Sequence, residues 1–190
     1  MAEQGDRRGR GARPARAPRR ITPDYLQRAA MHYLERYSAP AAQLRRVLAR
    51  KIALSCRHHG EHPALHITAL DDVVARCVSS GLVDDERFAE ARAATLRRRG
   101  RSARAVAASL AAKGVGRELA ERASTSGDEE EMAAARTTAR RKRLGPWSRG
   151  DRAANRQKDL AALARAGFSI AVARAVIDGA GDDDADGGAA

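Results

Sequence analysis

The 190-residue sequence has few aromatic side chains, which make up 3% of it, and only two cysteines, Cys56 and Cys77. Hydrophobic residues reach 43% largely because alanine is abundant. Alanine supports helices but buries little area, so each hydrophobic core should be thin. No apolar run approaches the roughly 18 residues of a membrane-spanning helix, and the first residues lack the apolar stretch of a signal peptide. We therefore expect a cytoplasmic protein whose two cysteines remain thiols.

Sequence patterns typical of enzymes are also missing. The sequence has no glycine-rich phosphate-binding loop, and no segment has the pattern of a strand that such a loop would follow. The carboxylates of residues 84–86 and 128–131 lie where helices should begin, and helix capping explains them. No serine, histidine and acidic residue form a pattern suited to acyl transfer. We predict a non-enzymatic protein with no catalytic residues and no cofactor.

One short segment is rich in side chains that bind zinc: Cys56, His58, His59, His62 and His66. The spacing matches none of the usual zinc fingers, and no Cys-x-x-Cys pair occurs. Cys77 falls on the apolar face of its predicted helix, where cysteine acts as a small hydrophobic residue. A metal site, a polar surface loop and a partner-contact loop all stay open as interpretations. We favour the surface loop and predict no metal site.

Basic residues outnumber acidic ones, which gives a net charge of +12 and a pI near 11.0. This excess indicates an anionic partner, such as nucleic acid or a filament that coats it. Residues 1–21 should form a disordered basic arm, because their composition cannot offset the entropy lost on ordering. The arm is either a solubilising extension or a non-specific phosphate-binding tail. Residues 181–190 should form a disordered acidic tail, either a solvated end or an internal competitor for the basic surface.

Between the tails, apolar residues recur at helical spacing, and several residues signal where helices begin or end. Thr22 precedes a proline at a predicted first helical position, and Asp84 follows Gly81, which can end the preceding helix. Asp128 with Glu131 has the pattern of a capping box. The patterns predict nine helices, of which the last six cover about residues 84–99, 102–113, 116–124, 128–144, 151–166 and 169–178.

An internal repeat organises these helices. Segments 48–51, 110–114 and 163–167 are similar, begin 62 and 53 residues apart, and align as the ends of three equivalent second helices. We therefore predict an all-α fold of three tandem three-helix repeats, each resembling a helix-turn-helix unit, that form an elongated, curved body. The predicted boundaries of the three repeats are 22–82, 83–126 and 127–180.

Arginine and lysine gather at the ends of two predicted helices. Like charges placed so closely repel one another, and an acidic partner would relieve this repulsion. A solvated face is the other interpretation of such a run. We favour a surface that binds a protein partner or DNA, made of Arg97, Arg98, Arg99, Arg101, Arg104, Arg136, Arg140, Arg141, Lys142 and Arg143. Of these, Arg136, Arg140 and Arg143 should share one face of their helix.

The middle of the chain carries a family resemblance. Gly81-Leu82-Val83-Asp84-Asp85-Glu86-Arg87-Phe88-Ala89 is followed by the arginine-rich helix end at 97–99, by Gly100-Arg101-Ser102, and by a helix that closes in Lys113-Gly114. In this order the segments resemble the RecX family of bacterial regulatory proteins, which modulate the RecA recombinase. The resemblance extends from about Tyr25 to Ile177. It implies three tandem three-helix repeats, in agreement with the repeat found in the sequence itself.

The resemblance also implies a function. The resemblance implies binding in the groove of the RecA nucleoprotein filament, which would oppose strand exchange, ATP hydrolysis and co-protease activity, or alter filament growth. This places the family in DNA repair, homologous recombination and the SOS response. We therefore predict a monomeric regulator that binds the RecA filament and inhibits it. Its charge should also give weak, non-specific binding to single- or double-stranded DNA.

The alternative is a helix-turn-helix protein that acts directly on nucleic acid, because three-helix units can resemble that motif. Such a protein reads bases with Asn, Gln or Arg on its recognition helix. The predicted third helices, at residues 69–79, 116–124 and 169–178, hold few such residues. Sequence-specific reading is therefore the second interpretation.

Overall fold

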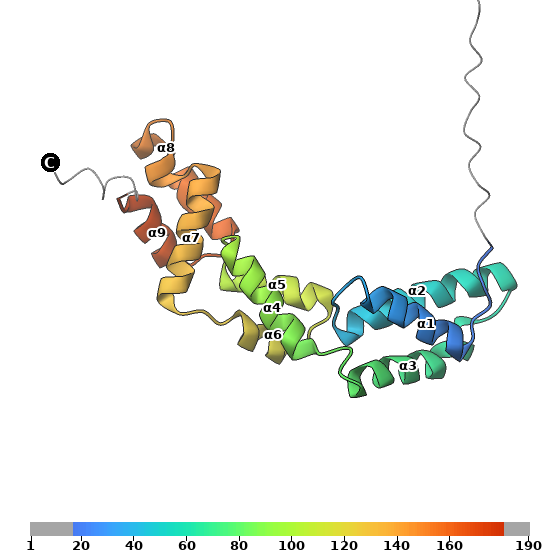
Figure 1. Cartoon of the computed structure of the whole chain (residues 1–190). Coiled ribbons are helices and arrows are strands. Elements are labelled where there is room, and N and C mark those ends of the chain that lie inside the picture. The colour runs from blue at the N-terminus through green and yellow to red at the C-terminus, as the bar shows by residue number, and fades with distance from the viewer. Residues whose placement is uncertain (1–16, 181–190) are drawn as a thin grey trace, which may run out of the picture.

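The computed structural model describes residues 17–180, so the predictions made for residues 1–16 and 181–190 lie outside it. Within the described range the chain forms nine α-helices, two short 3₁₀ helices and no strand (Figure 1). The α-helices are α1 Pro23–Leu34, α2 Ala41–His59, α3 Ile67–Ser79, α4 Asp85–Arg98, α5 Ala103–Lys113, α6 Arg117–Ser124, α7 Asp128–Lys142, α8 Arg152–Arg165 and α9 Ile170–Asp178. The 3₁₀ helices are η1 Pro63–His66 and η2 Gly145–Trp147.

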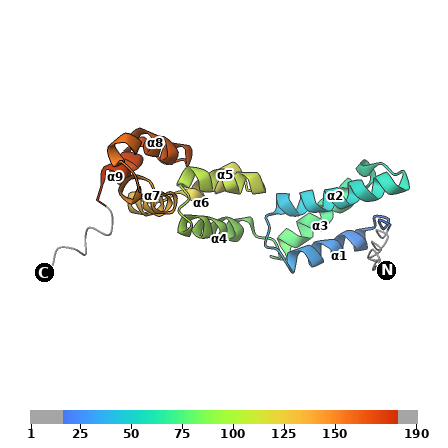
Figure 2. The same cartoon turned by 90° about the horizontal axis from the view of Figure 1, so that it is seen from above.

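The helices pack as three bundles, each around its own hydrophobic core. The first core centres on Leu26, Leu48 and Val73, the second on Leu110 with several alanines, and the third on Leu163 with residues of α9. The bundles follow one another along a bent, elongated body rather than sharing one core (Figures 1 and 2). The predicted all-α fold of three tandem three-helix repeats with a curved body is thus confirmed.

Most predicted helix starts are correct because they depend on local chemistry. The side chains of Thr22, Asp84, Ser102, Asp151 and Ser169 each accept a hydrogen bond from an amide in the first turn that follows. The capping box at the start of α7 is wrong. Gly127 is the cap residue, without a side-chain bond, and Asp128 is already helical. The Glu131 side chain instead accepts hydrogen bonds from Ser126 and from α5.

The second helices are equivalent at their cores but not at their ends. Leu48, Leu110 and Leu163 are all fully buried at matching positions of α2, α5 and α8. The expectation that α2 ends near Lys51 is wrong, because the helix continues for two more turns to His59. Its buried face continues through Ile52 and Cys56 in this extension, so packing favours the longer helix.

Part of the predicted basic arm lies within the described range and contacts α2. Ile21 is buried in the first core. The Ser55 hydroxyl donates to the Arg19 carbonyl oxygen at 2.8 Å, and His59 Nε2 lies 2.9 Å from the Pro18 carbonyl oxygen. Residues 18–21 are therefore part of the first bundle, in contrast to the expectation that disorder extends to residue 21.

Across residues 17–180, none of the helices is both long enough and apolar enough to cross a membrane.

Candidate partner-binding surface

Neighbouring bundles are joined by hydrogen bonds to helix ends. At the first junction, the amide of Ala41, the first residue of α2, donates to Asp85 Oδ1 of α4 at 2.7 Å. Arg46 of α2 donates from Nη2 to the carbonyl oxygen of Lys113, the last residue of α5. An acidic residue from the second bundle therefore caps α2 of the first bundle, and an arginine of the first caps the end of α5.

The second junction repeats this scheme. The amide of Ala103, the first residue of α5, donates to Glu131 Oε2 of α7 at 3.0 Å. The Ser102 hydroxyl donates to the carbonyl oxygen of Ala166, just after the end of α8, at 2.8 Å. The end of α5 thus meets the start of α2, and the end of α8 meets the start of α5. Figure 2 shows α8, α5 and α2 in one row as a result.

This second junction gathers basic side chains around a small cavity of about 210 Å³. Arg141 is fixed there, because its Nη1 donates to the Arg99 carbonyl oxygen at 2.8 Å. Among the described residues no carboxylate lines the cavity. Its lining is Arg101, Thr138, Arg141, Lys142, Ala162, Arg165 and Ala166. Four cationic side chains from α7, α8 and the turn before α5 therefore converge on one place.

Arg165 was missed by the sequence reasoning. It is the last residue of α8 and joins Arg101, Arg141 and Lys142 through the fold alone. The signal was present in the internal repeat, because residue 165 lies in the third copy of the repeated segment, next to the predicted helix end. We call the set of Arg101, Arg141, Lys142 and Arg165 the junction cations.

The basic residues near the end of α4 differ in their contacts: one binds backbone carbonyl groups, and the others are exposed to solvent. Arg97 donates from Nη2 to the carbonyl oxygens of Ala123 and Thr125, so its side chain holds the end of α6. Arg98 donates to Thr95 Oγ1 within its own helix at 3.3 Å. The side chains of Arg98, Arg99 and Arg104 are exposed, whereas Arg97 is half-buried. Arg97 therefore stabilises the second bundle rather than offering a free charge.

Helix α7 carries basic residues on two different faces. Arg136 and Arg140 are one turn apart and exposed, whereas Thr138 and Arg141 face the second junction. Arg136 lines a separate cavity together with Asp128, Glu129 and Met132. The ten predicted residues therefore do not form a single surface.

Arg143 corrects one detail of the prediction. The helix ends at Lys142, and Arg143 follows it with a left-handed backbone of φ 58°. It is exposed but does not continue the face of Arg136 and Arg140, because that face requires helical geometry through residue 143.

Acidic residues of the described chain pair with other arginines. Arg156 forms a bidentate contact with Asp178, with both N···O distances 2.7 Å, and this hydrogen bonding lowers the pKa of the Asp178 carboxyl below its ordinary value. Arg45 pairs with Asp71, and Arg122 with Glu86. Within residues 17–180, none of the ten predicted basic residues has a carboxylate partner within 4.0 Å. Their positive charge is therefore not neutralised by direct ion pairs inside the described chain.

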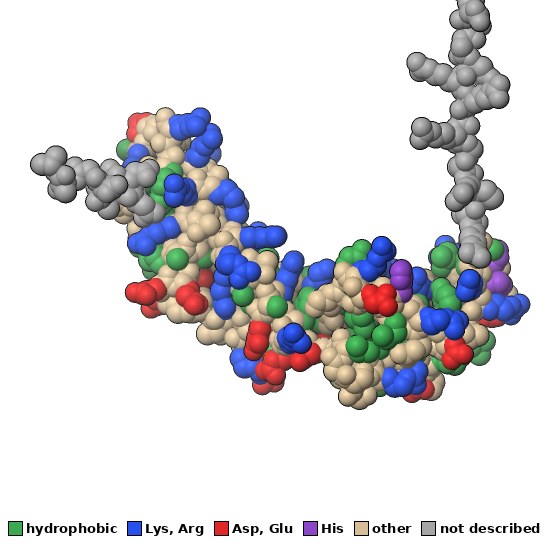
Figure 3. Space-filling view, viewed as in Figure 1, with side chains coloured by type: hydrophobic (Ala, Val, Ile, Leu, Met, Phe, Trp, Pro, Cys, Tyr) green, Lys and Arg blue, Asp and Glu red, His purple; other side chains and the backbone are tan. Residues whose placement is uncertain are grey.

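The charges also differ between the two sides of the bend. Figure 3 shows Lys and Arg side chains along the inner side, over the region where α8 meets α5. Many of the Asp and Glu side chains lie on the opposite, outer edge in the same view, where Lys and Arg side chains also appear. The inner side of the bend is thus richer in positive side chains over the region where α8 meets α5.

Comparison with known proteins agrees with this architecture. The family model described as RecX, second three-helix domain, matches residues 84–123, which span α4 to α6. The regulatory protein RecX of Myxococcus xanthus (strain DK1622) is 44% identical over 170 residues, covering 87% of this chain and 91% of that protein. The chain belongs to the RecX family. The resemblance found in the sequence is therefore confirmed, although no solved structure matches the chain significantly.

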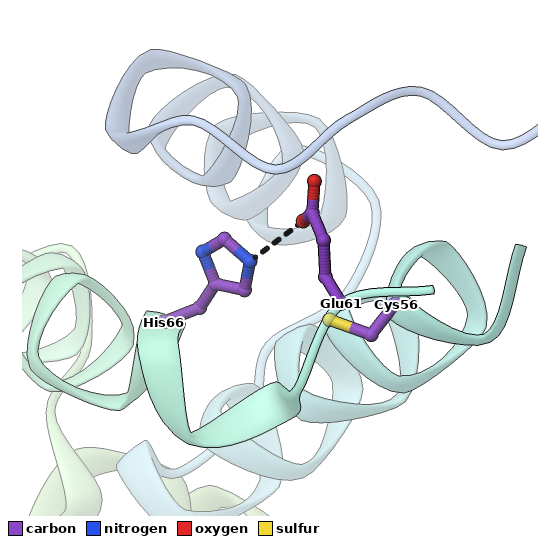
Figure 4. Close-up of side chains that lie close together, drawn as sticks. All are labelled: Cys56, Glu61 and His66. Atoms are coloured by element: carbon purple, nitrogen blue, oxygen red, sulfur yellow. Dashed lines mark hydrogen bonds and ion pairs between the residues drawn. The ribbon is translucent and has the colours of Figure 1, made fainter. Parts of the chain in front are cut away.

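In this RecX-family protein, the cysteine and histidine segment does not stay together as a single cluster. Cys56 Sγ, His66 and the carboxylate of Glu61 lie within 4.8 Å of one another (Figure 4). His62 instead accepts a hydrogen bond from the Ala64 amide at the start of η1, and His59 contacts Pro18. The sequence reasoning missed Glu61, because a single carboxylate near histidines has no distinctive spacing.

Proposed function

We propose that this RecX-family protein is a non-enzymatic, cytoplasmic regulator that binds the RecA nucleoprotein filament and inhibits its recombinase, ATPase and co-protease activities. Membership of a family whose relative is called a regulatory protein supports a regulatory role. The observation that carries the proposal is the junction cavity, where four cations meet without a carboxylate among its lining residues. Such a site favours an anionic partner, because a partner's negative charge would relieve the repulsion between the cations.

The shape of the molecule supports a partner that is long and repetitive. Three bundles in a bent row can contact several successive protomers of a filament, each contact being weak (Figure 1). Linked weak contacts act multivalently, so assembled filament should be bound more tightly than free RecA. We propose that the junction cations form the centre of the contact surface. Arg136 and Arg140 lie on another face of α7 and add only to the net charge. The other exposed predicted residues extend the contact surface, namely Arg98, Arg99, Arg104 and Arg143.

We further propose that the three bundles correspond to three domains, with boundaries after residues 82 and 126, acting within one monomer. The first domain then includes residues 18–21, which contact α2. Separate cores support this division, because each group of helices buries its own apolar side chains. The three bundles would then contact successive protomers of the filament at a fixed spacing.

The test measures binding to three targets and, in parallel, the ATPase activity of RecA. Full-length protein is titrated against free RecA, bare single-stranded DNA and the RecA–DNA filament, and RecA ATPase on single-stranded DNA is followed in parallel. We expect the tightest binding to the filament and a falling ATPase rate. An unchanged rate together with no co-sedimentation at stoichiometric excess would reject the proposal.

Sequence-specific DNA reading is less well supported by the third helices. In α6, Arg117 pairs with Glu121 and Arg122 pairs with Glu86, so both arginines already have acidic partners. Exposed polar positions of α3 include the acidic Asp71 and Asp72. Base recognition needs free donors and acceptors on the reading helix. We therefore propose that DNA binding is weak, depends steeply on salt and does not depend on sequence, which a gel shift with scrambled duplexes would check.

A further inference from the structure

We propose that Cys56, Glu61 and His66 form a binding site for one transition-metal ion of the zinc class. The three residues lie at the far end of the first bundle, on α2, on the turn after it and on η1 (Figure 4). The site is independent of the proposed action on RecA, because it uses none of the basic residues assigned to the partner-binding surface.

The turn after α2 explains why Glu61 comes back to Cys56. Gly60 ends the helix with a left-handed backbone of φ 71°, and its amide donates to the Cys56 carbonyl oxygen. The Glu61 amide donates to the same oxygen at 3.0 Å. The chain therefore folds back over the last turn of α2, which brings the Glu61 carboxylate beside the Cys56 thiol.

The distances within the group fit a tetrahedral ion. His66 Nε2 and Glu61 Oε2 are 3.2 Å apart. Two ligands at bond lengths of about 2.0–2.1 Å in a tetrahedron are themselves about 3.3 Å apart, so this pair has the spacing that zinc requires. The Cys56 sulfur lies within 4.8 Å of a ring nitrogen of His66 and of a carboxylate oxygen of Glu61, so the side chains need to close a gap of no more than about 1.3 Å to complete the set.

The ligand types select the ion. A thiolate and an imidazole favour zinc and its close relatives over calcium or magnesium, which prefer oxygen ligands. Cys56 is buried, whereas the side chains of Glu61 and His66 keep 23% and 16% of their surface exposed. An ion can therefore reach the site from solvent. Three protein ligands leave a fourth position for water, and the thiol proton passes to solvent when sulfur binds.

Arg20 gives the site an outer partner. Its Nη1 contacts Glu61 Oε1 at 2.6 Å, while the other carboxylate oxygen, Oε2, faces His66. The carboxylate can thus bind an ion through Oε2 and keep the Arg20 contact. Such outer contacts orient metal ligands and typically change metal affinity by about 10–100-fold when removed. Metal binding would also fasten residues 18–21 to the end of α2.

The experiment uses full-length protein stripped of metal by a chelator and titrated with Co²⁺, then with Zn²⁺. We expect one Co²⁺ per chain, with a thiolate-to-cobalt charge-transfer band that Zn²⁺ abolishes. Cys56→Ser should lose the band, whereas Cys77→Ala and His58→Gln should keep it. Absence of the band from the wild type, or its persistence in Cys56→Ser, would overturn the proposal.

Further variants guard against misfolding and against adventitious binding by exposed histidines. His66→Gln and Glu61→Gln change partly exposed side chains, and circular dichroism checks that they fold. Both should lower Zn²⁺ affinity at least tenfold and abolish the rise in Tm that Zn²⁺ gives the wild type. Arg20→Ala should weaken Zn²⁺ binding about tenfold but keep its 1:1 stoichiometry. Zn²⁺ uptake that falls only in His58→Gln or His62→Gln would overturn the site.

Discussion

Gly114 packs directly against Ala42 across the first junction, so closely that a Cβ added to Gly114 would lie 2.6 Å from the Ala42 Cβ. Gly167 has the same relationship to Ser102 at the second junction, where an added Cβ would lie 2.5 Å from the Ser102 Oγ. Both glycines follow the end of a second helix with a left-handed backbone. The two junctions therefore share one packing arrangement, in which a left-handed glycine after a second helix contacts the start of the second helix of the preceding bundle. Because this arrangement recurs with each repeat, we expect it to set how successive bundles are oriented.

Replacing either junction glycine with alanine should destabilise the protein by more than the backbone strain alone. A left-handed alanine costs about 1–2 kcal/mol, and overpacking adds about 1–3 kcal/mol. Gly60→Ala is the matched control, because Gly60 has φ 71° but nothing within 4 Å of an added Cβ. Urea unfolding should rank Gly114→Ala and Gly167→Ala below Gly60→Ala in stability. Equal losses in the free energy of unfolding at all three positions would show that close packing at the junctions adds nothing to the backbone strain.

Glu131→Ala should lower the free energy of unfolding by about 1 kcal/mol, because it removes the acceptor for the Ala103 amide at the start of α5. Glu130→Ala changes the same charge on the exposed, neighbouring position of α7 and serves as control. It should change stability by less than about 0.5 kcal/mol. Thermal unfolding of both variants at one salt concentration makes the comparison. A control as unstable as Glu131→Ala would assign the effect to charge rather than to the junction.

The Asp178–Arg156 pair should make the free energy of unfolding fall as the pH is lowered. The folded-state pKa of Asp178 is lowered, mainly by the hydrogen bond from Arg156, so its contribution is complete above the unfolded value near 4. It is lost as pH falls through the lower folded-state pKa. Asp178→Asn should therefore show a smaller loss of stability between about pH 5 and 2 than the wild type. Asp72→Asn, which leaves the Arg156 pair intact, should keep the wild-type slope in a series of urea unfolding curves.

Sequence reasoning succeeded where structure depends on neighbours along the chain. Thr22 and Asp84 cap their own helices, so local pattern was enough to place them. It failed at the junctions, because Glu131 has the pattern of a local cap but accepts from another bundle. Arg97 looked like a free charge, yet it binds the end of α6, and only the fold reveals those carbonyl partners. The approach of Arg165 to the junction likewise depends on packing between helices far apart in sequence.

The last prediction separates the junction cations from positive charge in general. Lys142→Ala with Arg165→Ala removes two charges that line the junction cavity and form no ion pair with the described residues. Arg136→Ala with Arg140→Ala removes the same net charge from another face of α7, where Arg136 shares a cavity with Asp128 and Glu129. Each pair of changes alters the net charge equally, so long-range attraction to a polyanion should fall equally in both.

Binding to the RecA filament should then distinguish the two double variants. Exposed charges contribute up to about 1 kcal/mol each, so losing two direct contacts at the junction should weaken binding about fivefold to thirtyfold. The control pair should weaken it about twofold, through net charge alone. Sedimentation of filament with each variant over a range of salt concentrations measures both effects. If the two double variants lose the same filament affinity, binding depends on total charge, and the junction cations make no specific contact with the filament.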